Sequence, residues 1–180
     1  MLNPAPQTTP QRPGTESLES WLARHPLLAP LHGMHTRQKE QVQLPDEAVT
    51  QLIGAADHPN PKVRWWCAHE LDHLADERSL DALLRLTKDD VPKVRVEAVH
   101  ALGCARCKQC VLPVDMVELM VDFALHDPEE RVRGAAIFAL GYLPADPRAA
   151  AALADLADDP SLSAKLRTEA RRKVKYHQPA

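Results

Sequence analysis

The 180-residue sequence is poor in aromatic side chains and has no large excess of charge of either sign. Phe, Trp and Tyr make up 4% of the residues, and the apolar set is mostly Ala, Leu and Val. Small aliphatic side chains favour helices that pack closely in pairs. The net charge of -3 gives no overall electrostatic argument for binding nucleic acid or a membrane surface.

Two kinds of segment are also missing from the sequence. No apolar run approaches the roughly 20 residues that a membrane-spanning helix needs. The N-terminus lacks the basic and apolar regions of a secretory signal, so a cytoplasmic location is expected. That compartment keeps thiols reduced, so metal or redox chemistry is a better expectation than disulfides for the four cysteines.

The sequence has instead an internal repeat. A basic residue, an aliphatic residue and an arginine recur four times, at Lys62-Val63-Arg64, Lys93-Val94-Arg95, Arg131-Val132-Arg133 and Lys165-Leu166-Arg167. The central aliphatic residues follow one another at 31, 38 and 34 residues, and each opens an apolar helical run. A period of this length indicates stacked helical pairs, in which equivalent positions of neighbouring repeats become neighbours in space.

The repeat divides the chain into four parts. Residues 1–14 contain four prolines and are expected to form a disordered tail. Residues 15–44 are expected to cap the stack, with Trp21 covering its exposed end. The repeat domain is predicted over residues 45–176, and residues 177–180 form a C-terminal tail.

Turn residues recur in step with the helices. Aspartates precede each helix that carries the repeated pattern, at Asp57, Asp89-Asp90, Asp127 and Asp159, and are expected to cap its exposed amides. Gly103 and Gly141 fall at matching places near helix ends, where a left-handed residue is expected.

These residues resemble the HEAT-like repeats, particularly the short form also found in phycobilisome lyases, over about residues 45–176. The resemblance is carried by Asp127-Pro128, Val132-Arg133, Ala135-Ala136 and Ala139-Leu140-Gly141, and by Val94-Arg95, Ala98 and Ala101-Leu102-Gly103. It implies an all-α fold, a right-handed α-solenoid of stacked antiparallel helix pairs. It also implies a scaffold that binds another protein, since such repeats serve mostly as binding surfaces.

Three cysteines form the first candidate site. Cys104, Cys107 and Cys110 have two C-x-x-C spacings in tandem and lie in the longest connection between repeats. His100 lies one helical turn before Cys104, so these four residues can hold a structural zinc ion. Iron or an iron–sulfur cluster is the alternative, although a four-cysteine cluster is incomplete. Thiol redox chemistry and a loop of unligated thiols also remain open.

The segment His69-Glu70-Leu71-Asp72-His73 forms the second candidate site, because it matches a zinc-protease motif. The repeat register places His69 beside His100 and His73 beside Cys104, so the four can also form a metal-binding patch across two helices. A solvated polar face is the favoured interpretation. In deoxyhypusine hydroxylases, which bind two irons, His-Glu pairs follow Val-Arg directly. Those histidines are absent here, so that activity is not carried over.

Protein and nucleic-acid partners would use different residues. Trp65 and Trp66 are predicted as one core residue and one exposed binding residue, and Arg171 and Arg172 as contacts for an acidic partner. The repeated arginines Arg64, Arg95, Arg133 and Arg167 can form a track for nucleic acid. Pairing of each arginine with a turn aspartate of its own or the next repeat is the favoured interpretation.

The sequence therefore predicts a protein-binding scaffold rather than an enzyme. A structural zinc site is a further hypothesis, and no catalytic residue is assigned. A metal-dependent enzyme or a metal or redox sensor is the alternative, centred on His69, Glu70, His73, His100 and the three cysteines. A nucleic-acid binder is a third and less favoured interpretation.

Overall fold

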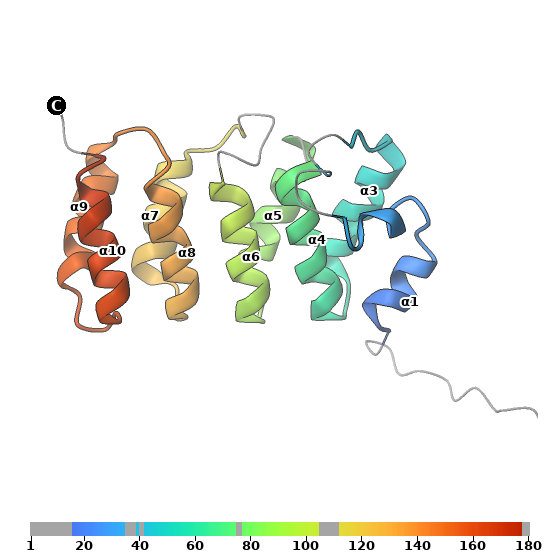
Figure 1. The fold of residues 1–180 in the computed structure, drawn as a ribbon, viewed down its shortest axis with the longest axis horizontal. Helices are drawn as coiled ribbons and strands as arrows, with labels where there is room; N and C mark the ends of the chain where they lie inside the picture. The colour runs from blue at the N-terminus through green and yellow to red at the C-terminus, as the bar shows by residue number, and fades with distance from the viewer. Residues whose placement is uncertain (1–15, 35–38, 40–41, 75–76, 105–111, 178–180) are drawn as a thin grey trace, which may run out of the picture.

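A computed structural model describes residues 16–34, 39, 42–74, 77–104 and 112–177. The predicted disordered tail, Cys107, Cys110 and most of the C-terminal tail lie outside these residues. The described chain is a stack of helices (Figure 1). Its α-helices are α1 (Leu18–Ala23), α3 (Asp46–Gly54), α4 (Pro61–Leu74), α5 (Leu80–Leu86), α6 (Pro92–Gly103), α7 (Met116–His126), α8 (Glu130–Leu140), α9 (Pro147–Asp158) and α10 (Ala164–Val174).

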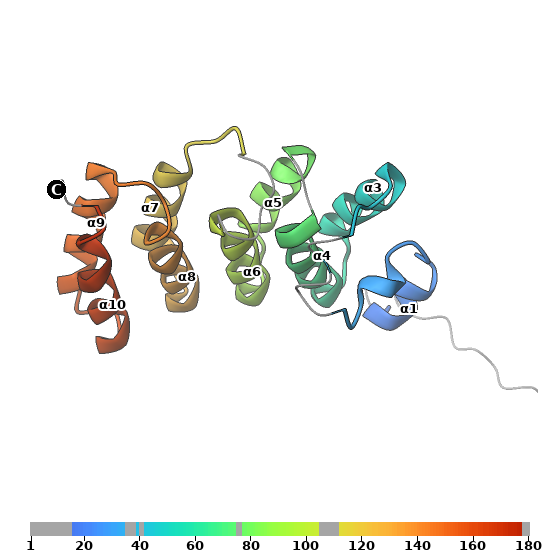
Figure 2. The same cartoon turned by 45° about the horizontal axis from the view of Figure 1, so that its top comes forward.

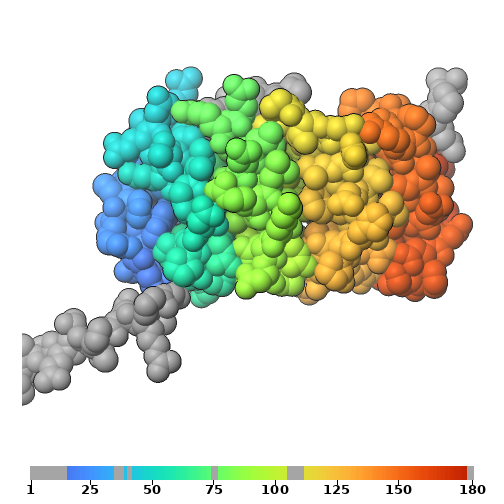
Figure 3. All heavy atoms as spheres, turned by 180° about the vertical axis from the view of Figure 1, so that it is seen from behind, coloured from blue at the N-terminus to red at the C-terminus, as the bar shows by residue number. Residues whose placement is uncertain are grey.

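The helices form two rows. Helices α4, α6, α8 and α10 carry the repeated basic–aliphatic–Arg pattern from their second residue, and we call them the motif helices. They lie side by side, and α3, α5, α7 and α9 form the row behind them (Figures 1 and 2). From behind, successive segments form adjacent bands along the long axis (Figure 3). The described ranges contain no strand, and the predicted all-α solenoid of helix pairs is confirmed.

Each described helix is too short or too polar to span a bilayer.

Short polar residues start the motif helices by accepting backbone hydrogen bonds. Oδ1 of Asp89 accepts from the amide of Val91 at 2.8 Å, and Oδ1 of Asp127 accepts from the amide of Glu129 at 2.8 Å. Such side-chain turns satisfy amides that precede the first helical turn. Before α4 the acceptors are His58 and Asn60 rather than the expected Asp57, which pairs with Arg85 on the surface.

The repeated apolar positions form the core. Val63, Val94 and Val132 are at most 1% exposed. The next two positions are at most 2% exposed and are filled by Cys67, Ala98 and Ala136, and by Leu71, Leu102 and Leu140. At the N-terminal end Trp21 is 4% exposed and packs edge-on against Trp66, with ring centroids 5.9 Å apart, as expected for a capping residue.

Gly103 and Gly141, which we call the signature glycines, do not have the role expected of them at helix ends. Among the described residues only Gly33 has a positive φ, of 96°, so Gly103 and Gly141 are not left-handed. A Cβ atom on Gly103 would collide with Cβ of Ala139 in α8, and one on Gly141 would collide with the Lys173 side chain in α10. Gly103 is therefore needed for the close approach of α6 to α8, whereas Gly141 makes room for the Lys173 side chain.

Candidate functional site

A polar cluster lies on α4, where the histidine-rich segment was predicted to be a solvated face. Of the four residues expected on that face, His69, His73, His100 and Cys104, only His73 is buried, at 6% exposed, so the expectation is wrong for His73. Its neighbours Glu70 and Asp72 are also buried, at 1% and 2% exposed. Lys39, from the segment before α3, is itself 3% exposed and contacts this face. Lys39 therefore helps to bury this part of the polar face of α4.

Glu70 is held by a lysine. The ammonium of Lys39 donates to Oε1 of Glu70 at 2.6 Å. Burial raises the pKa of Glu70, while the hydrogen bond and charge of Lys39 act in the opposite direction.

His69 is tied to the next repeat through a glutamate. Its Nδ1 lies 2.8 Å from Oε1 of Glu97 in α6, and this hydrogen bond is the main cause of the raised pKa of His69. Glu97 also accepts from Nε1 of Trp65 at 2.9 Å, and the Trp65 ring stacks on His69 with centroids 5.5 Å apart. Because His69 and Glu70 are bound to Glu97 and Lys39, the arrangement gives no support to the zinc-protease motif.

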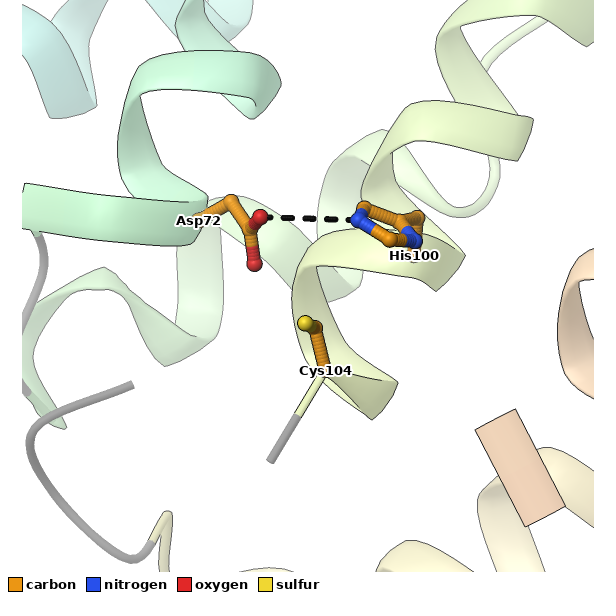
Figure 4. A group of neighbouring side chains, drawn as sticks. All are labelled: Asp72, His100 and Cys104. Carbon is orange, nitrogen blue, oxygen red and sulfur yellow. Dashed lines mark ion pairs between the residues drawn. The ribbon is translucent and has the colours of Figure 1, made fainter. Parts of the chain in front are cut away.

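Three potential metal donors meet between α4 and α6 (Figure 4). One donor atom from each of Asp72, His100 and Cys104 lies within 4.8 Å of the other two. Nε2 of His100 is 3.5 Å from Oδ2 of Asp72, and Nε2 of His73 is 3.4 Å from the same oxygen. The structure therefore brings together His100 and Cys104 as predicted, with His73 beside Asp72, but not His69.

Asp72 is the site residue that sequence reasoning missed, although a signal was present. It follows Val63 by the same interval by which Gly103 follows Val94 and Gly141 follows Val132. A carboxylate thus stands where the other repeats carry the signature glycine. Cys107 and Cys110 lie outside the described residues, so their part in a metal site stays a prediction.

The repeated arginines form ion pairs with aspartates, which is the interpretation favoured from the sequence. Arg95 makes two hydrogen bonds of 3.0 Å to the carboxylate of Asp127, from Nε and Nη2. Arg64 binds Asp89 and Asp90 in the same way, and Arg133 binds Asp159. Each arginine reaches the turn of the next repeat, so three of the four charges are neutralised locally. This pairing counts against a nucleic-acid track.

We expect Arg95→Leu to lower the free energy of unfolding by about 1.5–3 kcal/mol, the range for hydrogen bonds to charged groups. The side chains of Arg95 and Asp127 are only 12% and 6% exposed, so the aspartate left behind is poorly hydrated. Urea unfolding followed by circular dichroism measures the difference. Arg171→Leu is the control, because that arginine is 62% exposed and should change stability little; equal losses in both variants would refute the inter-repeat role.

The predicted partner-binding residues differ in exposure. Trp66 is 3% exposed, so it is the core residue of the pair and is unsuited to partner binding. Trp65 is half-buried, and the ammonium of Lys93 lies 4.5 Å from the centroid of its ring. Arg171 and Arg172 are exposed and form surface ion pairs with Asp158 and Glu169.

An exposed aromatic patch was not predicted. Phe138, Tyr142 and Tyr176 are 44%, 43% and 60% exposed and surround the ammonium of Lys173, which is 4.9, 4.6 and 5.8 Å from their respective ring centroids. Phe138 occupies the repeat position of His69 and His100. Comparing the residues at this repeat position could therefore have located the patch from the sequence.

Comparisons with known proteins agree with this architecture. A family model described as HEAT repeats matches residues 42–103 and again residues 92–173. No curated protein matches the chain. The two matched segments together cover most of the sequence, and they contain the motif helices described above except the last residue of α10. The chain therefore belongs to the family of HEAT-repeat proteins.

Proposed function

We propose that the chain is a scaffold that binds another protein through its exposed aromatic patch, made by Phe138, Tyr142 and Tyr176 around Lys173. The observation that carries the proposal is the concentration of apolar surface. Of the four large hydrophobic side chains that are exposed in the described part of the chain, three belong to this patch. Exposed aromatic side chains gathered in one place are typical of protein interfaces.

The rings of the patch are already ordered. Phe138 and Tyr142 pack edge-on with centroids 5.0 Å apart, and Lys173 is only 4% exposed among the rings. The absence of a side chain on Gly141 makes room for the lysine stem. Ordered aromatic groups lose little conformational entropy on binding, so they suit the role of interface anchors.

Charged groups beside the patch fit the rim of an interface. The guanidinium of Arg172 is 60% exposed and lies 2.6 Å from Glu169, a pair that solvent screens and that a partner carboxylate can replace. Arg172 was predicted as a contact for an acidic partner, and its place next to Lys173 in α10 keeps that role in the proposal.

The test compares captured proteins across matched variants. We expect Tyr142→Ser/Tyr176→Ser to lose a specific protein that wild type retains in affinity capture with quantitative mass spectrometry, because two of the three exposed rings are removed. Leu27→Ser is the control, since Leu27 is 39% exposed but lies in the capping segment. Loss of the same protein from the control, or no loss from the tyrosine variant, would refute the patch as the binding surface.

We also propose a structural zinc ion in the connection of residues 104–110, as a second feature of the scaffold. The proximity of His100 and Cys104 to each other and to Asp72 supports it. In this role the ion orders the longest connection between repeats and stabilises the stack. Cys107→Ser tests the contribution of the connection, within the metal titration described below.

A further inference from the structure

The residue at the repeat position of Gly103 and Gly141 faces the next motif helix. Gly103 contacts α8 and Gly141 contacts α10 at this position, so in the first repeat the equivalent Asp72 faces α6. Figure 4 shows its carboxylate directed at His100, with Cys104 one turn further along the same side of α6. Asp72 is 2% exposed, so the carboxylate lies at the interface of two repeats rather than in solvent.

We propose that Asp72, His100 and Cys104 are three ligands of a zinc ion that joins α4 to α6. The inference rests on the metal part of the proposed function through His100 and Cys104. It adds a ligand from a neighbouring repeat, and it needs neither Cys107 nor Cys110. The ion would then cross-link two helices, which is a different role from closing a loop.

The distances fit a shared cation better than a direct hydrogen bond. Nitrogen–oxygen hydrogen bonds are about 2.7–3.2 Å long. His100 Nε2 and Asp72 Oδ2 are 3.5 Å apart. Two such ligands of a tetrahedral zinc ion are about 3.3 Å apart, or about 3.6 Å when one is sulfur. All three donor atoms lie within 4.8 Å of one another, so the site closes with side-chain shifts of roughly 1 Å.

The donor types select the metal. A thiolate, an imidazole and a carboxylate are all common zinc ligands, whereas magnesium and calcium prefer oxygen ligands alone. The two anionic donors balance the charge of a divalent ion, which compensates a carboxylate buried at the interface. Nε2 of His73 lies 3.4 Å from the same oxygen of Asp72, so a second imidazole nitrogen stands beside the three donors.

The test is a titration of the full, untagged chain with zinc alone. The protein is reduced, stripped of metal and titrated in competition with a coloured chelator. We expect one zinc ion per chain and at least about tenfold weaker binding in Asp72→Asn, His100→Ala and Cys104→Ser. With cobalt in place of zinc, wild type should show a thiolate-to-metal absorption band that Cys104→Ser loses. His100→Ala keeps the test valid if Asp72→Asn folds poorly, because the His100 side chain is 45% exposed.

Two further variants separate this site from its alternatives. Asp122→Asn is the matched control, because Asp122 lies 2.9 Å from His126 on the surface, and its zinc affinity should equal that of wild type. Weakened binding in Asp72→Asn with normal binding in Cys107→Ser supports the site between helices and removes the site in the connection. Weakened binding in both supports the inter-helix site with Cys107 as a further ligand. Normal binding in Asp72→Asn and His100→Ala, or no stoichiometric zinc in wild type, overturns the inference.

Discussion

Replacing Lys39 by methionine should lower the free energy of unfolding by about 3–5 kcal/mol at neutral pH, the usual cost of breaking a buried ion pair. The Lys39 ammonium lies 2.6 Å from Oε1 of Glu70, and the two side chains are 4% and 1% exposed. Oε2 of Glu70 has no hydrogen-bond partner among the described residues, so the lysine is its main compensation. Methionine fills similar space but leaves the buried carboxylate without a cation. Urea unfolding followed by circular dichroism measures the loss.

The loss in Lys39→Met should depend on pH in a definite direction. Burial already raises the pKa of Glu70 against the opposing effect of Lys39, so removing the lysine raises that pKa further. The folded variant then holds a proton that the unfolded chain releases near the ordinary glutamate pKa of about 4.3. Its stability therefore falls as the pH rises above that value, and the deficit is small near pH 4. A deficit independent of pH would contradict this account.

Two variants control for the loss of the lysine side chain itself. Lys39→Met/Glu70→Gln should recover most of the stability, since no charge is left buried. Arg85→Met removes a comparable pair on the surface, where Arg85 and Asp57 are 49% and 66% exposed, and should cost at most about 1 kcal/mol. A loss in Arg85→Met as large as that in Lys39→Met would argue against burial as the cause.

The sequence predicts the stack because periodicity and helix geometry are both local information. The recurring Val63, Val94 and Val132 place one buried position in each repeat, and the structure buries all three. The same register predicts that an arginine can reach the aspartate of the next turn, as Arg95 reaches Asp127. These contacts follow from a fixed interval along the chain, so no further knowledge of the fold is needed to predict them.

The candidate site was only partly predictable, because some of its contacts lie outside the repeat. Lys39 comes from a segment without the repeated pattern, so no interval places it over Glu70. Its contact explains why part of a polar helix face is buried. Asp72, in contrast, stands at the position of Gly103 and Gly141. Its role was missed because those glycines were interpreted as helix ends, whereas their physical purpose is contact with the next repeat.

Because Gly103 contacts the next repeat, we expect Gly103→Ala to lower the free energy of unfolding substantially. The added methyl group would overlap Cβ of Ala139 and lie 3.1 Å from Sδ of Met120. The methionine can move, but the Ala139 methyl is attached directly to the backbone of α8, so α6 and α8 must separate. Overpacking of this kind costs about 1–3 kcal/mol, and we expect about 3 because neither backbone can yield locally. The midpoint of urea unfolding measures the change.

A reciprocal exchange distinguishes this collision from a requirement for glycine in the backbone. Gly103→Ala/Ala139→Gly moves the methyl group from α8 to α6, so most of the lost stability should return, less about 1 kcal/mol for glycine within α8. Gly54→Ala is the matched control, because a Cβ there meets no atom within 4 Å and its φ of -62° suits alanine. It should be neutral or slightly stabilising. If the double variant were no more stable than Gly103→Ala, the contact between the two methyl groups would not be the cause.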